Sequence, residues 1–189
     1  KTSLRYGLSM GASKAYLLKD AAFEDSDSWG TSYGLAKAIK SIGDFDVILC
    51  GKQAIDDDAG QVGPGIAEQL GISQITYVSE IVSVTADTLT AKRVSPAGEE
   101  VVEAKLPVVL TCEPRYPTLK RTRMANRAEI PEMDCAAVGA DPAKVGKNSP
   151  SAIKKLYTPA PRQSGELIKG DPEEIAKIAV QKLVEQKII

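Results

Sequence analysis

The residues best suited to chemistry gather in one loop, CGKQAIDDDAGQVGP, at residues 50–64. Its glycines, Gly51, Gly60 and Gly63, would let a ligand approach the backbone closely. The apolar run FDVILC precedes the loop and is typical of a buried parallel strand. A helix is predicted to begin near Pro64, and the N-terminus of a helix favours an anion such as phosphate. The loop therefore lies where open α/β sheets bind ligands, at the carboxyl end of a strand.

Three consecutive acids, Asp56, Asp57 and Asp58, lie in the same loop. Carboxylates beside a phosphate would repel it, so these acids are better suited to bind ribose hydroxyls, cap the backbone or hold a cation. The alternative is an ordinary acidic turn between a strand and a helix. The glycine spacing matches neither G-x-G-x-x-G nor G-x-x-x-x-G-K-[ST]. On these residues alone, nucleotide binding and an ordinary loop both remain open.

The composition excludes several kinds of catalytic site. The chain has no histidine, which removes Ser-His-Asp triads, histidine-paired cysteine nucleophiles and histidine-ligated zinc. The cysteines, Cys50, Cys112 and Cys135, lack metal-ligand spacing, and Cys50 is interpreted as a small core residue. We therefore expect no catalytic residue and no metal site, and assign any reactive chemistry to a bound cofactor.

Charge and hydropathy narrow the partners and the compartment. A net charge of -1 argues against broad nucleic-acid binding. No apolar run reaches the length of about 18 residues that spans a membrane, so no membrane insertion is expected. The start of the chain lacks the apolar core of a secretory signal. We expect a cytoplasmic protein in a prokaryote, or a mitochondrial matrix protein in a eukaryote.

Residues 115–127 form a basic stretch without an acid. A solvated loop is its simplest interpretation. A nucleic-acid patch would need interleaved aromatic residues, and Tyr116 is the only one there.

The elements around the first loop predict an alternating α/β unit. A helix over 28–42, with Asp27 or Ser28 as N-cap, leads to a strand over 45–50 that we expect to be central and buried on both faces. A second helix follows over 64–70. A short buried strand is also predicted at 15–18. This alternation predicts a parallel sheet.

Beyond Gly71 the pattern changes. Segments 75–84, 88–94 and 101–112 are rich in β-branched residues and predict antiparallel strands at one side of the sheet. From 113 to 160 the chain is rich in Pro, Lys and Arg, and we expect an extended arm. A helix over 171–189 closes the chain, with Asp171 as its cap.

The stretch 50–70, CGKQAIDDDAGQVGPGIAEQL, resembles the nucleotide-binding signature of electron-transfer flavoprotein β subunits. The segments that also match, in order, are Met10-Gly11-Ala12, DSWGTSYGLA at 27–36, AKLPVVLT at 104–111, Glu113-Pro114-Arg115-Tyr116 and GELIKGD at 165–171. The resemblance covers essentially the whole chain, which is identified as a member of this family.

The resemblance implies an α/β fold with a mostly parallel sheet of the adenine-nucleotide-hydrolase-like (Rossmann-like) type, antiparallel edge strands and an extended C-terminal arm. It implies a nucleotide-binding domain at 1–112, a partner-recognition loop at 113–130, and an arm and helix at 131–189 that pack on the α subunit. The family's chain normally begins with a strand, a helix and a second strand before the position of Lys1. We therefore expect an N-terminally incomplete form.

By resemblance, the loop binds the adenosine and phosphate of FAD or AMP, and a further FAD is held mainly by the α subunit. Members that hold AMP often have Asn-Gln-Thr where this chain has Gly60-Gln61-Val62. This chain therefore lacks an amide and a hydroxyl that would bind phosphate. Its Gln-Val-Gly-Pro sequence resembles that of the electron-bifurcating members, so we expect FAD rather than AMP. The implied cofactor-binding residues are Gly51, Lys52, Gln53, Ala54, Ile55, Asp56, Asp57, Asp58, Gly60, Gln61, Val62, Gly63 and Pro64.

The resemblance also implies partners. Residues 113–130 would dock onto a partner dehydrogenase, with Leu119 as an apolar anchor ringed by cations. The implied docking residues are Arg115, Tyr116, Leu119, Lys120, Arg121 and Arg123. We expect an electron carrier that works with an α subunit, serving NADH or acyl-CoA-type dehydrogenases and, if bifurcating, using NADH and ferredoxin. The rival interpretation is a free-standing adenine-nucleotide sensor without redox function.

Overall fold

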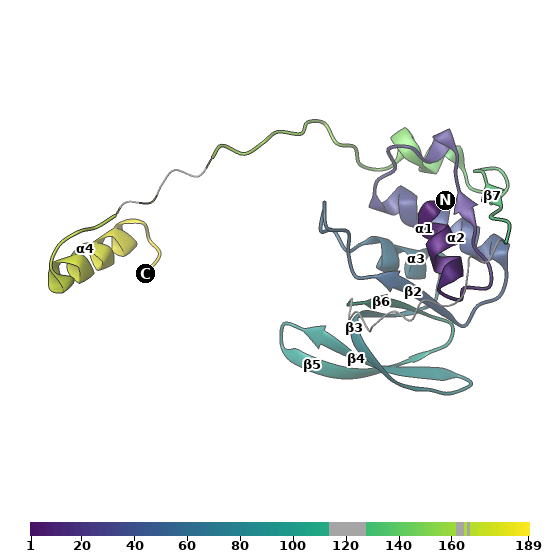
Figure 1. Cartoon of the computed structure of the whole chain (residues 1–189), viewed down its shortest axis with the longest axis horizontal. Coiled ribbons are helices and arrows are strands. Elements are labelled where there is room, and N and C mark those ends of the chain that lie inside the picture. Colours follow the sequence, from purple (N-terminus) through teal and green to yellow (C-terminus); the bar gives the residue numbers. More distant parts are fainter. Residues whose placement is uncertain (114–127, 162–164, 166) are drawn as a thin grey trace. The chain divides into compact units, whose positions relative to one another are not determined.

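The computed structural model describes residues 1–113, 128–161, 165 and 167–189. They form two compact units, Lys1–Ala152 and Ile153–Ile189, which are described separately (Figure 1).

A five-stranded sheet in the order β2-β6-β3-β4-β5 organises the first unit. Strand β6 (Val108–Cys112) lies between β2 (Val47–Gly51) and β3 (Ser73–Val84) and runs parallel to both. Strands β4 (Thr88–Ser95) and β5 (Gly98–Lys105) continue from β3 as an antiparallel meander. The predicted α/β class with a mostly parallel core and antiparallel edge strands is confirmed.

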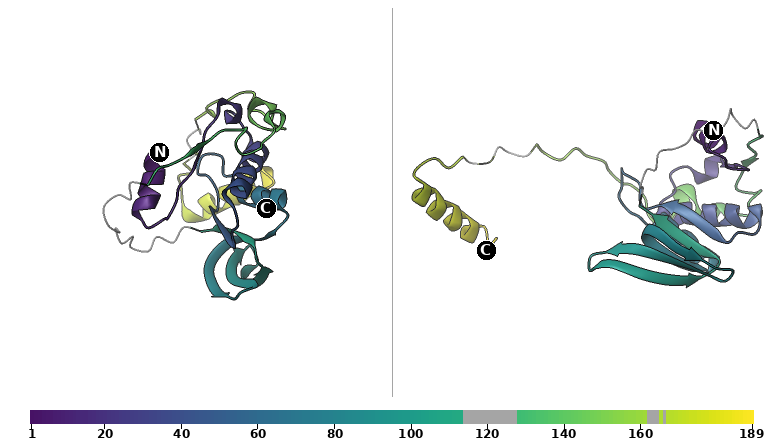
Figure 2. Two further views of the ribbon diagram at one scale, coloured as in Figure 1. Left: turned by 90° about the vertical axis from the view of Figure 1, so that its right-hand side faces the viewer. Right: turned by 60° about the horizontal axis from the view of Figure 1, so that its bottom comes forward.

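The core is built on β6, whose apolar side chains are buried on both faces. Val108 and Leu110 pack with Ile75 and Leu89 on one face. Val109 packs on the other face with Ile66 of helix α3 (Val62–Leu70). Helix α2 (Ser28–Ile42) packs on α3, and both helices lie on the same face of the sheet (Figures 1 and 2). This packing fixes the two helices beside the carboxyl ends of β2 and β6.

Two strand predictions are wrong in detail. Strand β2 is not central: within the described residues β6 is its single neighbour, and Leu49 is 64% exposed. The stretch 101–112 is two strands, β5 and β6, and β6 is parallel to its neighbours. Pro107, which has no N–H for a ladder, separates the two strands.

Of the small elements, β1 (Leu17–Leu18), β7 (Glu132–Met133) and the 3₁₀ turn η1 (Ala21–Phe23) pack against α2. Strand β1 is half-buried and pairs in parallel with β7, outside the main sheet. The other short elements are α1 (Thr2–Ser9) and the 3₁₀ turns η2 (Pro142–Lys144) and η3 (Gly146–Asn148).

The structure differs from the expected arm over residues 128–152. Cys135, Val138 and Val145 are buried in a cluster with Tyr33 of α2. The Asp20 carboxylate accepts hydrogen bonds from the N–H groups of Ala22 and Cys135, which hold its pKa below the usual value. The first compact unit thus extends to Ala152. The functional division at 1–112, 113–130 and 131–189 stays a prediction.

The second unit contains helix α4 (Pro172–Glu185), which begins as predicted behind the N-cap Asp171. Several apolar side chains of α4, including Ile178, Val180 and Val184, are exposed. Within the described residues, no helix is both long and apolar enough to cross a membrane.

Candidate functional site

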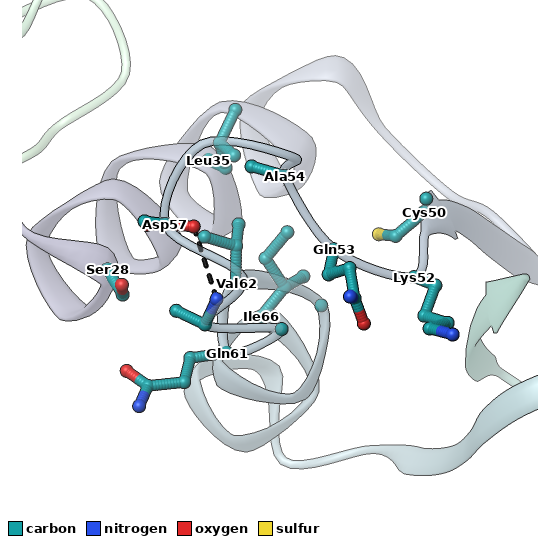
Figure 3. A pocket seen from close by; sticks show the side chains of 14 residues that line it. Ser28, Leu35, Cys50, Lys52, Gln53, Ala54, Asp57, Gln61, Val62 and Ile66 are labelled. Atoms are coloured by element: carbon teal, nitrogen blue, oxygen red, sulfur yellow. Dashed lines mark hydrogen bonds between the residues drawn. The ribbon is translucent and has the colours of Figure 1, made fainter. Parts of the chain in front are cut away.

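A cavity of about 390 Å³ lies at the carboxyl end of β2, where the chain enters the 51–61 loop (Figure 3). Its volume falls within the range of small-molecule sites, roughly 300–1,000 Å³. Helix α2 contributes Ser28 and Leu35, and helix α3 contributes Val62, Gly63 and Ile66. The cavity therefore combines an apolar wall with two helix N-termini and a polar loop.

Most of the predicted cofactor-binding residues meet at this cavity. Those that line it are Gly51, Lys52, Gln53, Ala54, Asp57, Gly60, Gln61, Val62 and Gly63. Ile55, Asp56, Asp58 and Pro64 do not line it, and the Ile55 side chain is fully exposed. The structure thus gathers one face of the predicted loop around a hollow and turns the other face to solvent.

Five lining residues were not predicted: Ser28, Leu35, Cys50, Ala59 and Ile66. Ser28 follows the N-cap of α2; the sequence predicted it as a helix N-cap candidate and as part of the family pattern, but not as a residue of the site. The signal that could have found it is the helix N-terminus, because backbone N–H groups converge there.

The acids of the loop hold its backbone. Asp57 accepts a hydrogen bond from the N–H of Ala59 at 3.2 Å, drawn as a dashed line in Figure 3. The carboxylate of Asp58 accepts from the Gln53 amide, and the N–H of Asp58 donates to the carbonyl of Ala54 at 3.2 Å. Gly60 has a φ of +61°, a conformation that glycine adopts without strain. Of the roles considered for the acids, capping of a backbone N–H by the carboxylate is present for Asp57, whereas the Asp58 carboxylate bonds the Gln53 side chain.

Helix α3 presents its N-terminus to the cavity. Its N-cap residue, Gln61, makes no side-chain capping bond. The first N–H groups of the helix, on Val62 and Gly63, belong to residues that line the cavity. Such N–H groups are the usual ligands of phosphate at a helix start.

Helix α2 is capped firmly beside the same cavity. Asp27 accepts from the N–H of Gly30 at 2.7 Å and from the hydroxyl of Ser151 at 2.7 Å. Burial works to raise the pKa of Asp27, but the hydrogen bonds from Gly30 and Ser151 outweigh it, and the pKa is lowered. The cap also ties the last part of the first unit to the helix that carries Ser28.

Lys52 lies at the edge of the cavity, where β2 passes into the loop (Figure 3). Its ammonium donates to Glu113 Oε1 at 2.9 Å and lies 5.2 Å from the centre of the Tyr77 ring. The hydrogen bond to Glu113 is the main cause of a raised pKa for Lys52. Partial burial opposes it, and the fields of Glu113, Tyr77 and Asp58 reinforce it.

Cys50 lines the cavity, but its thiol is not activated. Burial raises the pKa of Cys50, and the neighbouring Cys112 raises it further. A thiol with a raised pKa is a poor nucleophile at neutral pH. No group of acids or cysteines suited to a metal ion occurs in the described ranges.

The predicted docking residues, Arg115, Tyr116, Leu119, Lys120, Arg121 and Arg123, lie outside the described residues. Their role stays a prediction.

The comparisons with known proteins agree with the resemblance drawn from the sequence. A family model described as "Electron transfer flavoprotein domain" matches residues 1–138. The chain is 46% identical over 204 aligned positions to the electron transfer flavoprotein subunit beta of Megasphaera elsdenii, covering 100% of this chain and 75% of that one. It is 40% identical to the subunit of the same name from Clostridium acetobutylicum, with 100% and 74% covered.

A third relative is the caffeyl-CoA reductase-Etf complex subunit CarD of Acetobacterium woodii, 38% identical with 98% of this chain and 73% of that one covered. The match of the family model to most of the chain, together with similarity over the whole of this chain to named β subunits, confirms the family. The chain therefore belongs to the electron transfer flavoproteins, as one of their β subunits.

Proposed function

We propose that this β subunit binds an adenine nucleotide, FAD, in the cavity at the carboxyl end of β2, and that it transfers electrons as a heterodimer with an α subunit. The observation that carries the proposal is the N-terminus of α3, without a side-chain cap, opening into a cavity lined by the glycine-rich loop. This arrangement fits a phosphate, since backbone N–H groups and a helix dipole favour an anion.

The lining residues suit the parts of a nucleotide. The N–H groups of Val62 and Gly63 would bind phosphate oxygens. Asp57 has a second carboxylate oxygen and would accept ribose hydroxyls. Leu35 and Ile66 offer an apolar surface to an aromatic ring system.

Bound FAD would supply the electron-transfer chemistry, and this chain would hold and orient it. The chain's residues bind the phosphate, fix the ribose and exclude water from the apolar wall. No acid–base group of this chain is assigned to the reaction.

FAD is favoured over AMP by the sequence at the cavity edge. Gly60 and Val62 have no hydrogen-bonding side chain there, where members that hold AMP often have an asparagine and a threonine. We further propose NADH as the electron donor and ferredoxin as an acceptor, and a cytoplasmic location. The Etf complex named for CarD supports work within a larger assembly.

We propose that the predicted docking residues bind a dehydrogenase and that the second unit binds the α subunit. Exposed apolar side chains on α4, such as Ile178 and Val184, support the second assignment, because such a face is normally covered by a partner.

The test is the nucleotide content of the complex. The gene would be co-expressed with that of its α subunit, the purified heterodimer denatured, and FAD and AMP quantified. Two FAD and no AMP per heterodimer are expected. A content of one FAD and one AMP would mean that this site binds AMP and not FAD. A content of one FAD alone, the one held by the α subunit, would overturn the assignment of the cavity as a nucleotide site.

A matched pair of variants places the nucleotide. Val62→Trp fills the cavity and is expected to remove one nucleotide per heterodimer. Ile55→Trp introduces the same side chain at an exposed position outside the cavity and should retain it. Equal nucleotide content in both variants would place the ligand elsewhere. NADH-dependent flavin reduction in the same samples tests the donor.

A further inference from the structure

Lys52 lines the cavity, but its partners Glu113 and Tyr77 have no role in the site as proposed so far. Lys52 extends the ladder between β2 and β6 by one bond, its N–H donating to the carbonyl of Cys112 at 3.1 Å. Glu113 follows β6 directly, and its own N–H donates to the carbonyl of Val78 at 3.0 Å. These three residues thus join the carboxyl ends of β2 and β6 to β3.

The backbone of β3 departs from a regular strand in order to place Tyr77. The pairing of β3 with β6 shifts register between Ile75 and Val78. Tyr77 lies in that irregularity with a φ of +58°, a backbone conformation that residues other than glycine rarely adopt. Its N–H donates to the buried hydroxyl of Thr111 at 3.1 Å. Bulges of this kind re-aim a side chain, and here the re-aimed ring lies beside the Lys52 ammonium.

The positive charge of Lys52 can offset the negative charge of the loop. Asp56, Asp57 and Asp58 would repel the phosphate of a nucleotide, and among the described residues of the cavity wall Lys52 is the cation. A long lysine side chain has many rotamers and would hold its charge poorly without contacts. Glu113 fixes the ammonium by an ion pair, and the Tyr77 ring adds a cation–π contact.

We propose that Glu113 and Tyr77 are positioning residues for the nucleotide site. They hold Lys52 at the root of the loop, where its charge offsets the acids and admits an anionic nucleotide. This inference rests on the proposed function, because it assigns roles at the same cavity.

The direction in which one substitution changes nucleotide affinity distinguishes a positioning role of Glu113 from a purely electrostatic one. Glu113→Gln removes a negative charge near a bound anion, so a bare field would tighten nucleotide binding. If Glu113 acts by holding Lys52, the same change weakens binding instead. Glu80→Gln is the matched control, because Glu80 pairs with Lys92 at 2.7 Å on the meander, outside the cavity.

The measurement is the affinity of AMP, the part common to both candidate nucleotides, for the heterodimer stripped of its β-site nucleotide. Lys52→Met is expected to weaken AMP binding about tenfold. Glu113→Gln should weaken it several-fold, and Glu80→Gln should bind as the wild type does. Tyr77→Leu should weaken binding, while Tyr77→Phe retains the ring and should restore it.

A double variant shows whether Glu113 acts through Lys52. Lys52→Met/Glu113→Gln should bind AMP no more weakly than Lys52→Met alone. Thermal unfolding of each complex identifies variants that have lost their fold, and Tyr77→Phe keeps the test open if Tyr77→Leu fails to fold. Equal or tighter binding by Glu113→Gln, with normal wild-type binding, overturns this inference alone. A wild-type complex that binds no AMP and carries no nucleotide at this site overturns the proposed function and the inference together.

Discussion

Thr111 lies directly under the backbone of Gly63: a Cβ built on Gly63 would be 2.5 Å from Cγ2 of Thr111. Thr111 is 3% exposed and cannot turn its methyl group into solvent. Its hydroxyl is also held, since it accepts the N–H of Tyr77 at 3.1 Å. The start of α3, which borders the cavity, can therefore lie this close to β6 only with glycine at position 63.

Gly63→Ala should destabilise the protein by about 1–2 kcal/mol, because the overlap outweighs the better helix propensity of alanine. Thr111→Ser removes the methyl group and keeps the hydroxyl, so adding it to Gly63→Ala should recover part of the loss. Denaturant unfolding of the complexes measures both effects. No recovery in the double variant would mean that the overlap is not the cause.

Acid should weaken the fold partly through Asp27. Burial raises the pKa of this carboxyl, but hydrogen bonds from Gly30 and Ser151 lower it more, so the folded pKa lies below the unfolded value of about 3.9. Its stabilising contribution is present above that value and is lost as the pH falls through the folded pKa.

Asp27→Asn keeps an N-cap but cannot titrate. It should lower stability at neutral pH and make stability less dependent on pH between about 5 and 3. Asp87→Asn, in the exposed turn before β4, is the control. Unfolding free energies across this range measure the difference, and parallel pH profiles for Asp27→Asn and wild type would contradict the prediction.

Gly146 and Gly139 allow a paired test of the packing of 128–152. Both have positive φ, +60° and +64°. A Cβ on Gly146 would overlap the carbonyl oxygen of Ala22 and lie 3.0 Å from that of Glu24, whereas nothing lies within 4 Å of one on Gly139. Gly139→Ala should cost about 1 kcal/mol for its backbone conformation, and Gly146→Ala about 3 kcal/mol or more. Equal losses would show that 128–152 does not pack on η1 as described.

Cys50 provides a chemical probe of the cavity. Since burial, reinforced by Cys112, raises the pKa of its thiol, iodoacetamide should modify it more slowly at neutral pH than a free cysteine and faster as the pH rises. Bound nucleotide should slow the reaction further. Cys135, which is 4% exposed and does not line the cavity, serves as the internal reference in peptide mass spectra. Modification of Cys50 at the same rate with and without nucleotide would contradict the proposed site.

Local patterns predicted the elements with local causes. The helix over 28–42 was predictable because Asp27 caps it and Gly43 ends it. The loop after β2 was predictable because glycines and a following helix mark it. The split of 101–112 was missed because β-branched residues occur on both sides of Pro107. Strand direction depends on pairing partners far away in the sequence.

Tertiary contacts decided what the sequence could not. Cys135, Val138 and Val145 lie in a stretch without periodicity and are buried by a cluster that includes Tyr33 and Ala38 of α2. Within the loop, the hydrogen bonds of Asp57 and Asp58 determine which side chains face the cavity. The sequence alone therefore could not predict that Asp57 lines the cavity while Ile55 and Asp56 do not. The bulge at Tyr77 has no sequence signal, because tyrosine at a positive φ is disfavoured.

The insertion of β6 between β2 and β3 has a consequence for the order of folding. The β3–β4–β5 meander pairs neighbours along the chain, whereas β6 must find Val47 and Ser73 across long intervening segments. Non-local pairings of this kind form slowly, since loop closure comes before the contacts that stabilise it. We infer that the meander forms early and that Lys52 and Glu113 meet only when β6 docks. A nucleotide whose binding depends on both Lys52 and Glu113 would bind only to chains in which β6 has docked. Nucleotide binding would therefore indicate that the subunit has completed folding.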